Sequence, residues 1–457
     1  MTVQAPRSDR LPVSARRRTG DGDGLARAGV VLGIATLPIL QPAFVNNLAP
    51  ADLGLVAGIA AVLVWAGMTR QRLRLPYVAG MGVMVIAGTI AAAFGDLPWM
   101  GAVTVVQDLY LLAWAAALAN FGRTAARAGF IVDVWCLSAA AWSIALVVLY
   151  GPSTIGGGDD AERAGFTFGE QNAAGLWFAL SLLVMLAARR PRRWRWRAPA
   201  LGAVSLGLLL SGSLGAISGL FAGLAVALVL QVRARRGPDT AIAFSLALLL
   251  LVGSVGLLAQ QGELIDRASQ SPNPLIRNSI GRGSDSESER ILVNQQTFGL
   301  FQTSGFLGRG PVTTEHTLRQ QEAAYPHEAH NDWVAALVER GVLGFAGILL
   351  LALEVVVLAL TIWNPSRLKP DFAEVLPAPA YLVAGFILVA LYSLTHEVLH
   401  ERPLWTLFGT AAAFGLWGKA IAGPGGRHDR VGDRSCRVRW VASECGAARR
   451  RRRGGGR

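Results

Sequence analysis

The sequence predicts an all-helical integral membrane protein, and its composition and hydropathy pattern carry the prediction. Hydrophobic residues make up 52% of the 457 residues, charged residues only 16%, and the mean hydropathy is +0.41. Soluble domains carry roughly 25% charged residues. The apolar residues gather in about twelve runs, most of them near the roughly 20 residues that a spanning helix needs. A soluble globular enzyme, a disordered chain and a disulfide scaffold are therefore excluded.

The apolar runs place the membrane spans along the chain. The two spans between 198 and 232 are short, and the turn Ser211-Gly212-Ser213 between them can also be a kink within one longer helix. We expect spans at 28–46, 51–68, 76–94, 99–120, 129–150, 172–188, 198–211, 213–232, 239–260, 341–362, 378–397 and 401–422.

Basic residues predict the orientation of these spans. With twelve spans and both termini inside, 34 of the 43 Lys and Arg residues fall on the cytoplasmic side. Basic residues strongly prefer the cytoplasmic side of short loops. We therefore expect a multi-pass protein of the cytoplasmic (inner) membrane with both termini in the cytoplasm. The nine outer basic residues are Arg163, Arg267, Arg277, Arg282, Arg290, Arg309, Arg319, Arg340 and Arg402.

This topology divides the chain into five parts. A basic cytoplasmic leader covers 1–27, nine spans cover 28–260, and an outer catalytic loop covers 261–340. Three further spans occupy 341–422, and a disordered Arg-rich cytoplasmic tail occupies 423–457. A basic tail beside a bilayer is typical of contact with anionic lipids. We expect the lipid bilayer, and no nucleic acid, to be its partner.

The outer loop contains a predicted helix on the membrane surface or over the bundle. Ser286 and Glu289 have the S-x-x-E spacing of a capping box, and an apolar run from Ile291 to Phe301 follows. The helix should then end, because Gly305, Gly308, Gly310 and Pro311 come next.

His330 is the candidate catalytic residue of this loop. Asn331 or Asp332 can cap a short helix that ends at Gly341, which puts His330 at the helix N-terminus. The positive end of the helix dipole disfavours the imidazolium form, whereas Glu328 and Asp332 favour it. A neutral imidazole can accept a proton from a hydroxyl group.

Two other roles for the same histidine stay open. His327 and His330 have H-x-x-H spacing and, with Glu328 or Asp332, can bind zinc, with His396 and His400 as the other outer histidines that could complete a composite site. The shortage of nearby His and Cys ligands disfavours a closed structural site. The third role is structural, since a loop histidine can simply cap the helix or hydrogen-bond its own loop.

Arginines of the outer loops are candidate ligands for an anionic group. Arg290 can bind a diphosphate through its two-pronged guanidinium, or it can pair with Glu287 or Glu289. Other outer arginines that can join it are Arg163, Arg277, Arg282 and Arg309.

Three carboxylates fall within predicted spans and keep a transporter open as an alternative. Asp108, Asp133 and Glu354 are costly in a membrane, and such residues often serve an ion or proton pathway. They can equally bind a neighbouring helix. A transporter would also be expected to show inverted repeats, and the sequence has no evident repeat.

Four motifs follow one another in a fixed order along the chain. They are Phe166–Gly175, Ser211–Ala216, Glu289-Arg290 followed by Gly305–Gly310, and His330-Asn331 followed by Glu339–Gly344. This series resembles the O-antigen ligase and polymerase superfamily, bacterial membrane glycosyltransferases that use polyprenyl-diphosphate-linked glycans. The resemblance covers about 28–422 and is strongest over 285–350.

The resemblance implies a function and roles for named residues. It implies transfer of a glycan from a polyprenyl (undecaprenyl) diphosphate to an acceptor hydroxyl of a glycan or lipid-glycan, in surface polysaccharide biosynthesis, with no cofactor and no metal. His330 would be catalytic, and Asn331, His327 and Glu339 would support it. A ligase is expected, and a repeat-unit polymerase of the same superfamily stays open.

One departure from the family concerns the diphosphate. The family often has an arginine where this chain has Leu214. Another arginine would have to take its place, and Arg163 is the candidate beside Arg290 and Arg309.

Overall fold

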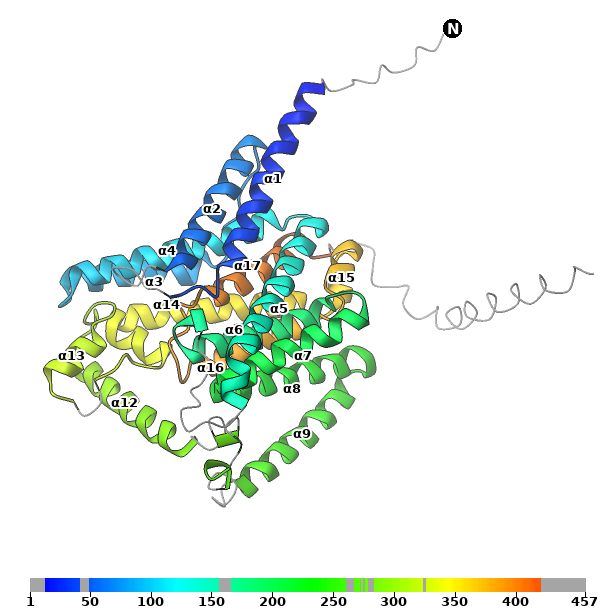
Figure 1. Cartoon of the computed structure of the whole chain (residues 1–457). Coiled ribbons are helices and arrows are strands. Elements are labelled where there is room, and N and C mark those ends of the chain that lie inside the picture. Colours follow the sequence, from blue (N-terminus) through cyan, green and yellow to red (C-terminus); the bar gives the residue numbers. More distant parts are fainter. Residues whose placement is uncertain are drawn as a thin grey trace, which may run out of the picture. The chain divides into compact units, whose positions relative to one another are not determined.

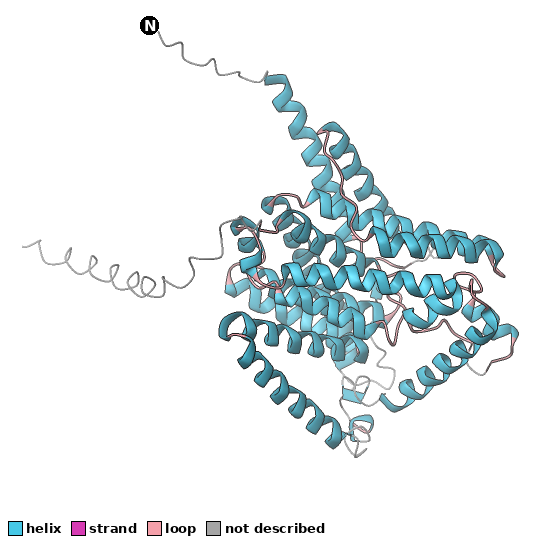
Figure 2. Cartoon of the chain, turned by 180° about the vertical axis from the view of Figure 1, so that it is seen from behind, coloured by secondary structure: helices cyan, strands magenta, loops and turns pink. Residues whose placement is uncertain are grey.

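The computed structural model is helical throughout the part of the chain it describes, which is 13–41, 49–155, 166–259, 267–271, 273, 276–277, 283–323 and 326–420. These residues contain no β-strand and a single isolated β-bridge, between Leu368 and Lys419. The chain divides into two units, Met1–Lys419 and Ala420–Arg457. Everything below concerns the first unit, and the expected Arg-rich tail, 423–457, lies outside the described residues (Figures 1 and 2).

The principal helices follow the apolar runs. They are α1 (Val13–Ala35), α2 (Pro50–Met68), α3 (Val78–Phe94), α4 (Pro98–Phe121), α5 (Ala125–Ile155), α6 (Gln171–Ala188), α7 (Trp194–Ser211), α8 (Leu214–Arg236), α9 (Pro238–Ala259), α12 (Gly283–Ser304), α13 (Thr314–Gln320), α14 (Asp332–Ile362), α15 (Pro370–Val375), α16 (Ala380–Tyr392) and α17 (Arg402–Trp417).

Each expected span overlaps one of these helices. Six of them, α2, α4, α5, α6, α8 and α14, are long and apolar enough to cross a membrane, and α3, α9 and α16 contribute shorter apolar stretches. The all-helical membrane fold is confirmed, whereas the count of twelve spans stays a prediction. The turn at Ser211–Ser213 separates two helices, since Gly212 adopts a left-handed φ of 59° there.

Several helix ends differ from the expected boundaries. Helix α14 begins at Asp332, nine residues before the expected span, because the short helix predicted there joins the spanning helix. Helix α16 ends at Tyr392, and the polar segment 393–401 that follows connects it to α17. Hydropathy alone does not detect such ends, because a capped helix can extend beyond its apolar stretch.

Small residues let the helices pack closely. A Cβ on Gly80 of α3 would lie 2.4 Å from the backbone nitrogen of Leu351 in α14. A Cβ on Gly223 of α8 would lie 2.6 Å from the carbonyl oxygen of Ala384 in α16. Membrane helices associate through such close backbone approaches, because lipid provides no hydrophobic driving force between them.

Segments at or near the predicted outer ends of the spans contact one another. The backbone N–H of Asp96 donates to the carbonyl of Arg309 (3.3 Å), and the Tyr392 hydroxyl donates to the carbonyl of Asn172 (2.9 Å). We call this end, which also holds α12 and α13 (Figure 1), the site end.

The loops that were predicted to be cytoplasmic meet at the opposite end of the helices, which we call the far end. The N–H of Ala378 donates to the carbonyl of Ala187 (3.0 Å), and the N–H of Lys369 donates to the carbonyl of Gly418 (2.7 Å). The short helix α15 lies here (Figure 1). Which of these two ends faces the cytoplasm stays a prediction of the charge pattern.

Candidate functional site

The candidate catalytic histidine lies directly before a capped helix. The side-chain oxygen of Asn331 accepts hydrogen bonds from the N–H groups of Trp333 (3.0 Å) and Val334 (3.2 Å), which is the geometry of an N-cap. His330 is half-buried and has a left-handed φ of 47°. The predicted cap is confirmed, and it holds the His330 backbone at the N-terminus of α14.

Asp332 ties this helix end to the segment between α16 and α17, residues 393–401, which we call the 393–401 loop. Its buried carboxylate accepts hydrogen bonds from the N–H groups of Val398 (3.0 Å) and Leu399 (3.3 Å). Its own N–H donates to the carbonyl of Ser393 (3.1 Å). Two segments far apart in sequence are therefore fixed against each other beside His330.

A break in α14 joins two of the sequence motifs. Gly341 has φ 66° and ψ −167°, and a Cβ there would lie 2.1 Å from the carbonyl oxygen of Phe306. The break leaves helix carbonyls without intrahelical partners. Those of Val338 and Glu339 accept from the N–H groups of Arg309 (3.0 Å) and Gly310 (2.9 Å). The predicted break at Gly341 is confirmed, although the chain continues as a helix beyond it.

Glu339 supports the loop that crosses this break. Its buried carboxylate accepts from the Thr314 hydroxyl (2.7 Å) and from the N–H of Val312 (2.9 Å). It therefore holds the segment between Gly310 and α13 against the first turns of α14. These contacts give Glu339 a positioning role, because its carboxylate holds the loop in place.

Two buried ion pairs lie behind these segments. Arg340 lies 2.5 Å from the Asp108 carboxylate of α4. Arg402 binds both carboxylate oxygens of Asp52 in α2, at 2.9 and 2.8 Å. The Tyr110 hydroxyl also donates to Asp52, at 2.6 Å. Paired, hydrogen-bonded charges of this kind tolerate burial, whereas unpaired ones do not.

The 393–401 loop brings four titratable groups to the site end, which are His396, Glu397, His400 and Glu401. Burial raises the pKa of Glu397 well above its usual range, and the nearby Glu339 and Glu328 raise it further, while a hydrogen bond from the Ala329 backbone opposes the rise. Burial also raises the pKa of Glu401 to about 7, against the pull of Arg402. Glu397 therefore lies close to His330, because it accepts a hydrogen bond from the backbone of the preceding residue, Ala329.

His400 completes this group. Its Nδ1 lies 3.8 Å from the Asp108 carboxylate, which favours the charged imidazole. Burial nevertheless lowers the pKa of His400 to about 4, and Arg340 and Arg402 lower it as well. The ring is thus neutral at pH 7.

From the sequence, His400 was expected only as a possible metal ligand. No role was predicted for Glu397, Asp52 or Tyr110. One feature of the sequence could have indicated these residues: a charge near the bilayer is energetically costly unless it is paired. Each acidic residue in or beside an apolar run requires a partner, and the outer arginines Arg340 and Arg402 were available as partners.

The structure describes some of the other predicted site residues and not others. The rings of His327 and His330 stack with centroids 6.1 Å apart. The Arg309 guanidinium donates from Nη2 to the Thr303 hydroxyl (2.8 Å), and its buried Nε has no hydrogen-bond partner within the described residues. Arg163 and the side chains of Arg290, Ser286 and Glu289 lie outside the described residues, as does Arg282.

The described residues contain no group of three or more His, Cys, Asp or Glu side chains placed to hold a metal ion. The zinc alternative built on His327 and His330 therefore has no complete ligand set among them.

The three carboxylates within predicted spans all have partners. Asp108 pairs with Arg340, and Asp133 lies 3.1 Å from Arg190. Glu354 accepts from the N–H groups of Ala79 (3.2 Å) and Gly80 (3.1 Å) at the start of α3. These contacts hold helices together, so the carboxylates give no specific support to an ion pathway.

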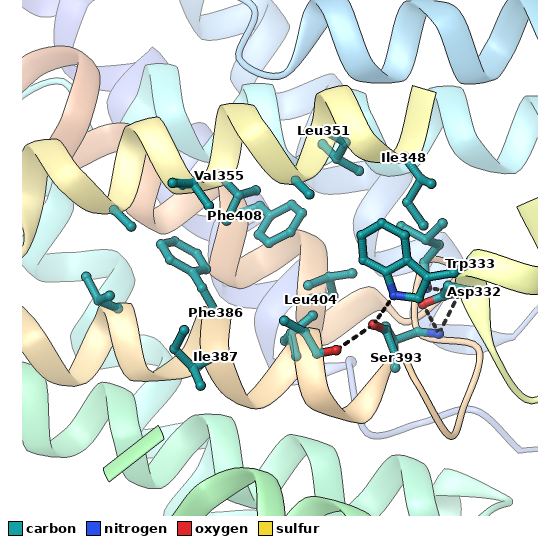
Figure 3. A pocket seen from close by; sticks show the side chains of 18 of the residues that line it. Asp332, Trp333, Ile348, Leu351, Val355, Phe386, Ile387, Ser393, Leu404 and Phe408 are labelled. Carbon is teal, nitrogen blue, oxygen red and sulfur yellow. Dashed lines mark hydrogen bonds between the residues drawn. The ribbon is translucent and has the colours of Figure 1, made fainter. Parts of the chain in front are cut away.

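An apolar groove of about 270 Å³ runs between α14 and α16 with α17 at its base (Figure 3). Leu351, Val355, Phe386 and Phe408 are among the side chains that line it. Its polar residues, Asp332, Trp333 and Ser393, lie together at one end (Figure 3), where the Trp333 indole N–H donates to the Ser393 hydroxyl (3.1 Å). The groove therefore leads from an apolar interior to the helix end that follows His330.

Comparison with known families identifies this region. A family model described as O-antigen ligase matches residues 199–349. We call this matched stretch, residues 199–349, the O-antigen ligase domain. The matched stretch runs from α7 into α14 and contains Arg290, Arg309, His330 and Glu339. The resemblance seen in the sequence is confirmed, and the domain implies a glycosyltransferase-like membrane enzyme of the O-antigen ligase and polymerase superfamily. A search of curated proteins gave no match.

Parts of the site lie outside the matched stretch. The 393–401 loop, with Glu397 and His400, follows the O-antigen ligase domain, and Asp52 and Asp108 precede it. The helices on both sides of the domain therefore complete its site end.

Proposed function

We propose that this protein transfers a glycan from a polyprenyl diphosphate to an acceptor hydroxyl on the outer face of the cytoplasmic membrane, as an O-antigen ligase does in surface polysaccharide biosynthesis. One observation carries the proposal. His330 lies within the O-antigen ligase domain and is held in front of α14 by the Asn331 cap, while Asp332 anchors the same helix end to the 393–401 loop.

In the proposed reaction, His330 acts as general base. The acceptor hydroxyl oxygen attacks the anomeric carbon of the donor and gives its proton to the imidazole. The bond between that carbon and the diphosphate oxygen breaks, and polyprenyl diphosphate leaves with the electron pair. Arg290, Arg163 and Arg309 balance the charge on the leaving group. One carboxyl oxygen of Glu397, Oε1, has no hydrogen-bond partner among the described residues, so the side chain is available to hydrogen-bond a sugar hydroxyl.

The groove between α14 and α16 is the proposed place for the isoprenyl chain of the donor. Its lining is apolar apart from the end formed by Asp332, Trp333 and Ser393. Apolar pockets with a few polar groups at one end are typical of amphiphilic ligands. A chain bound there would place its polar head near His330.

The orientation belongs to the same proposal. We place both termini in the cytoplasm, so that the site end faces outward. Arginines at the far end support this arrangement: Arg189 and Arg235, from two of the predicted cytoplasmic loops, line one pocket with the segment 377–380.

The test is the pool of polyprenyl-linked glycan in cells that carry His330→Ala at normal expression. We expect lipid-linked glycan to accumulate and surface glycan to be lost. Long accumulated chains indicate a ligase, and single repeat units indicate a polymerase. The matched control is His316→Ala in α13, whose ring contacts Gln320 of the same helix. An unchanged pool with normal surface glycan would contradict the proposal.

A further inference from the structure

A second pocket lies at the far end of the helices, away from the site already described. It measures about 240 Å³ and is formed where the ends of α6, α8 and α14 meet the turn before α16. Arg189, Gln231, Arg235, Trp363 and Asn364 line it, together with the segment 377–380.

Arginines surround this pocket. Arg189 and Arg235 line it directly. The guanidinium groups of Arg233 and Arg367 each lie 5.5 Å from the centre of the Trp363 ring. No acidic residue lines the pocket, and none of these four arginines forms an ion pair with a described residue. Their charge is therefore available to an anion.

Gln231 provides an independent sign of a missing ligand. Its side-chain Nε2 is buried and has no hydrogen-bond partner within the described residues. Buried polar atoms are nearly always paired, so an unpaired donor in a pocket lining calls for an acceptor. An anionic oxygen in the pocket would supply that acceptor.

The helix dipoles at this pocket do not cancel the positive charge of the arginines. The C-termini of α6, α8 and α14 each carry roughly −0.5 of a charge, and the N-terminus of α16 carries about +0.5. Four arginines contribute four full positive charges. The net potential around the pocket is therefore positive.

The surroundings identify the source of the anion. The three helices whose C-terminal ends form the pocket, α6, α8 and α14, are all candidate membrane spans. Leu230 and Trp363 line it beside the arginines. Tryptophan is enriched at the membrane–water interface, and basic pockets between spans are typical headgroup sites.

We propose that this pocket binds the phosphate-bearing headgroup of an anionic phospholipid. Arg189 and Arg235 bind the phosphate oxygens, and the Gln231 amide donates to one of them. Arg233 and Arg367, stacked on Trp363, add positive charge at the rim. The proposal does not depend on the glycan transfer.

Binding to the full-length, delipidated protein in detergent tests this proposal. Dioleoyl phosphatidylglycerol is the probe, with dioleoyl phosphatidylcholine and inorganic phosphate as comparisons, and bound lipid is counted by native mass spectrometry. Each arginine near a membrane surface contributes about a fivefold change in affinity. We therefore expect Arg189→Gln/Arg235→Gln to weaken phosphatidylglycerol binding about 25-fold.

The matched control is Arg193→Gln/Arg195→Gln, which removes two exposed arginines beside the same end but outside the pocket lining. We expect its affinity to stay within twofold of the unaltered protein, and both variants to keep their thermal unfolding temperature without lipid. An equal loss in both double variants, equal binding of phosphatidylcholine, or displacement of the lipid by inorganic phosphate at equal concentration would overturn the proposal.

Discussion

At the scale of single residues, the site end depends on charges that are buried only because they are paired. Arg340 and Asp108 belong to α14 and α4, and Arg402 and Asp52 belong to α17 and α2. Removing one partner of a buried pair leaves an uncompensated charge, which costs far more than removing both partners.

We therefore expect Asp108→Ala to destabilise the protein by about 3–5 kcal/mol, because Arg340 would stay buried without its carboxylate. Replacing both residues, as Asp108→Leu/Arg340→Leu, should restore much of that loss. Thermal unfolding in detergent measures both effects. Asp108→Ala with an unchanged unfolding temperature would show that the pair does not stabilise the fold.

His400 makes a pH-dependent prediction. Its pKa is about 4 in the folded protein and about 6.5 in an unfolded chain. Between these values the unfolded chain binds a proton that the folded protein does not, so stability falls as the pH drops from 6.5 to 4. His400→Gln should reduce this loss. The measurement is the unfolding temperature of the unaltered protein and of His400→Gln between pH 6.5 and 4. Identical pH profiles would contradict the lowered pKa of His400.

At the scale of elements, the break in α14 decides how the O-antigen ligase domain is assembled. Gly341 lets the helix carbonyls of Val338 and Glu339 reach the backbone of Arg309 and Gly310. Both sides of this contact had been named as motifs in the sequence, but their contact could not be foreseen from their spacing.

Gly341→Ala should cost about 1–3 kcal/mol or more, since the residue has a left-handed φ and its Cβ would lie 2.1 Å from the Phe306 carbonyl. Gly82→Ala in α3 is the control, because nothing lies within 4 Å of its Cβ position and alanine favours a helix. Denaturant unfolding compares the two. Equal stabilities would mean that the break does not require glycine.

Local features of these elements were predictable from the sequence, and distant contacts were not. The Asn331 cap and the break at Gly341 follow from residues within one or two turns of the helix. Arg340 and Asp108 are separated by 232 residues, and Arg402 and Asp52 by 350. Such pairs form only when the whole bundle assembles, so a single sequence shows the need for a partner without showing which partner is used.

At the scale of the whole molecule, the helices place the two kinds of loop at two ends. The site end holds His330 and the 393–401 loop, and the far end holds most of the described loop arginines. The charge pattern predicts which end faces the cytoplasm, since basic residues concentrate in alternate loops, and this orientation stays a prediction.

Labelling tests the orientation that we propose. In a variant without Cys136, Cys436 and Cys445, a single cysteine at exposed Gln302 of α12 should react with an impermeant maleimide in cells whose inner membrane is intact. A single cysteine at exposed Arg72 should react only after permeabilisation. The reverse pattern would place the site end in the cytoplasm and contradict the outward orientation.

The central claim is that His330 performs the chemistry of glycan transfer. The most direct measurement is the transfer rate of the purified protein in liposomes with a lipid-linked glycan donor and its acceptor. General base catalysis contributes about 10²–10⁴-fold, so His330→Ala should lower the rate by that factor while His316→Ala leaves it unchanged. A His330→Ala protein that folds and transfers glycan at the unaltered rate would contradict the account.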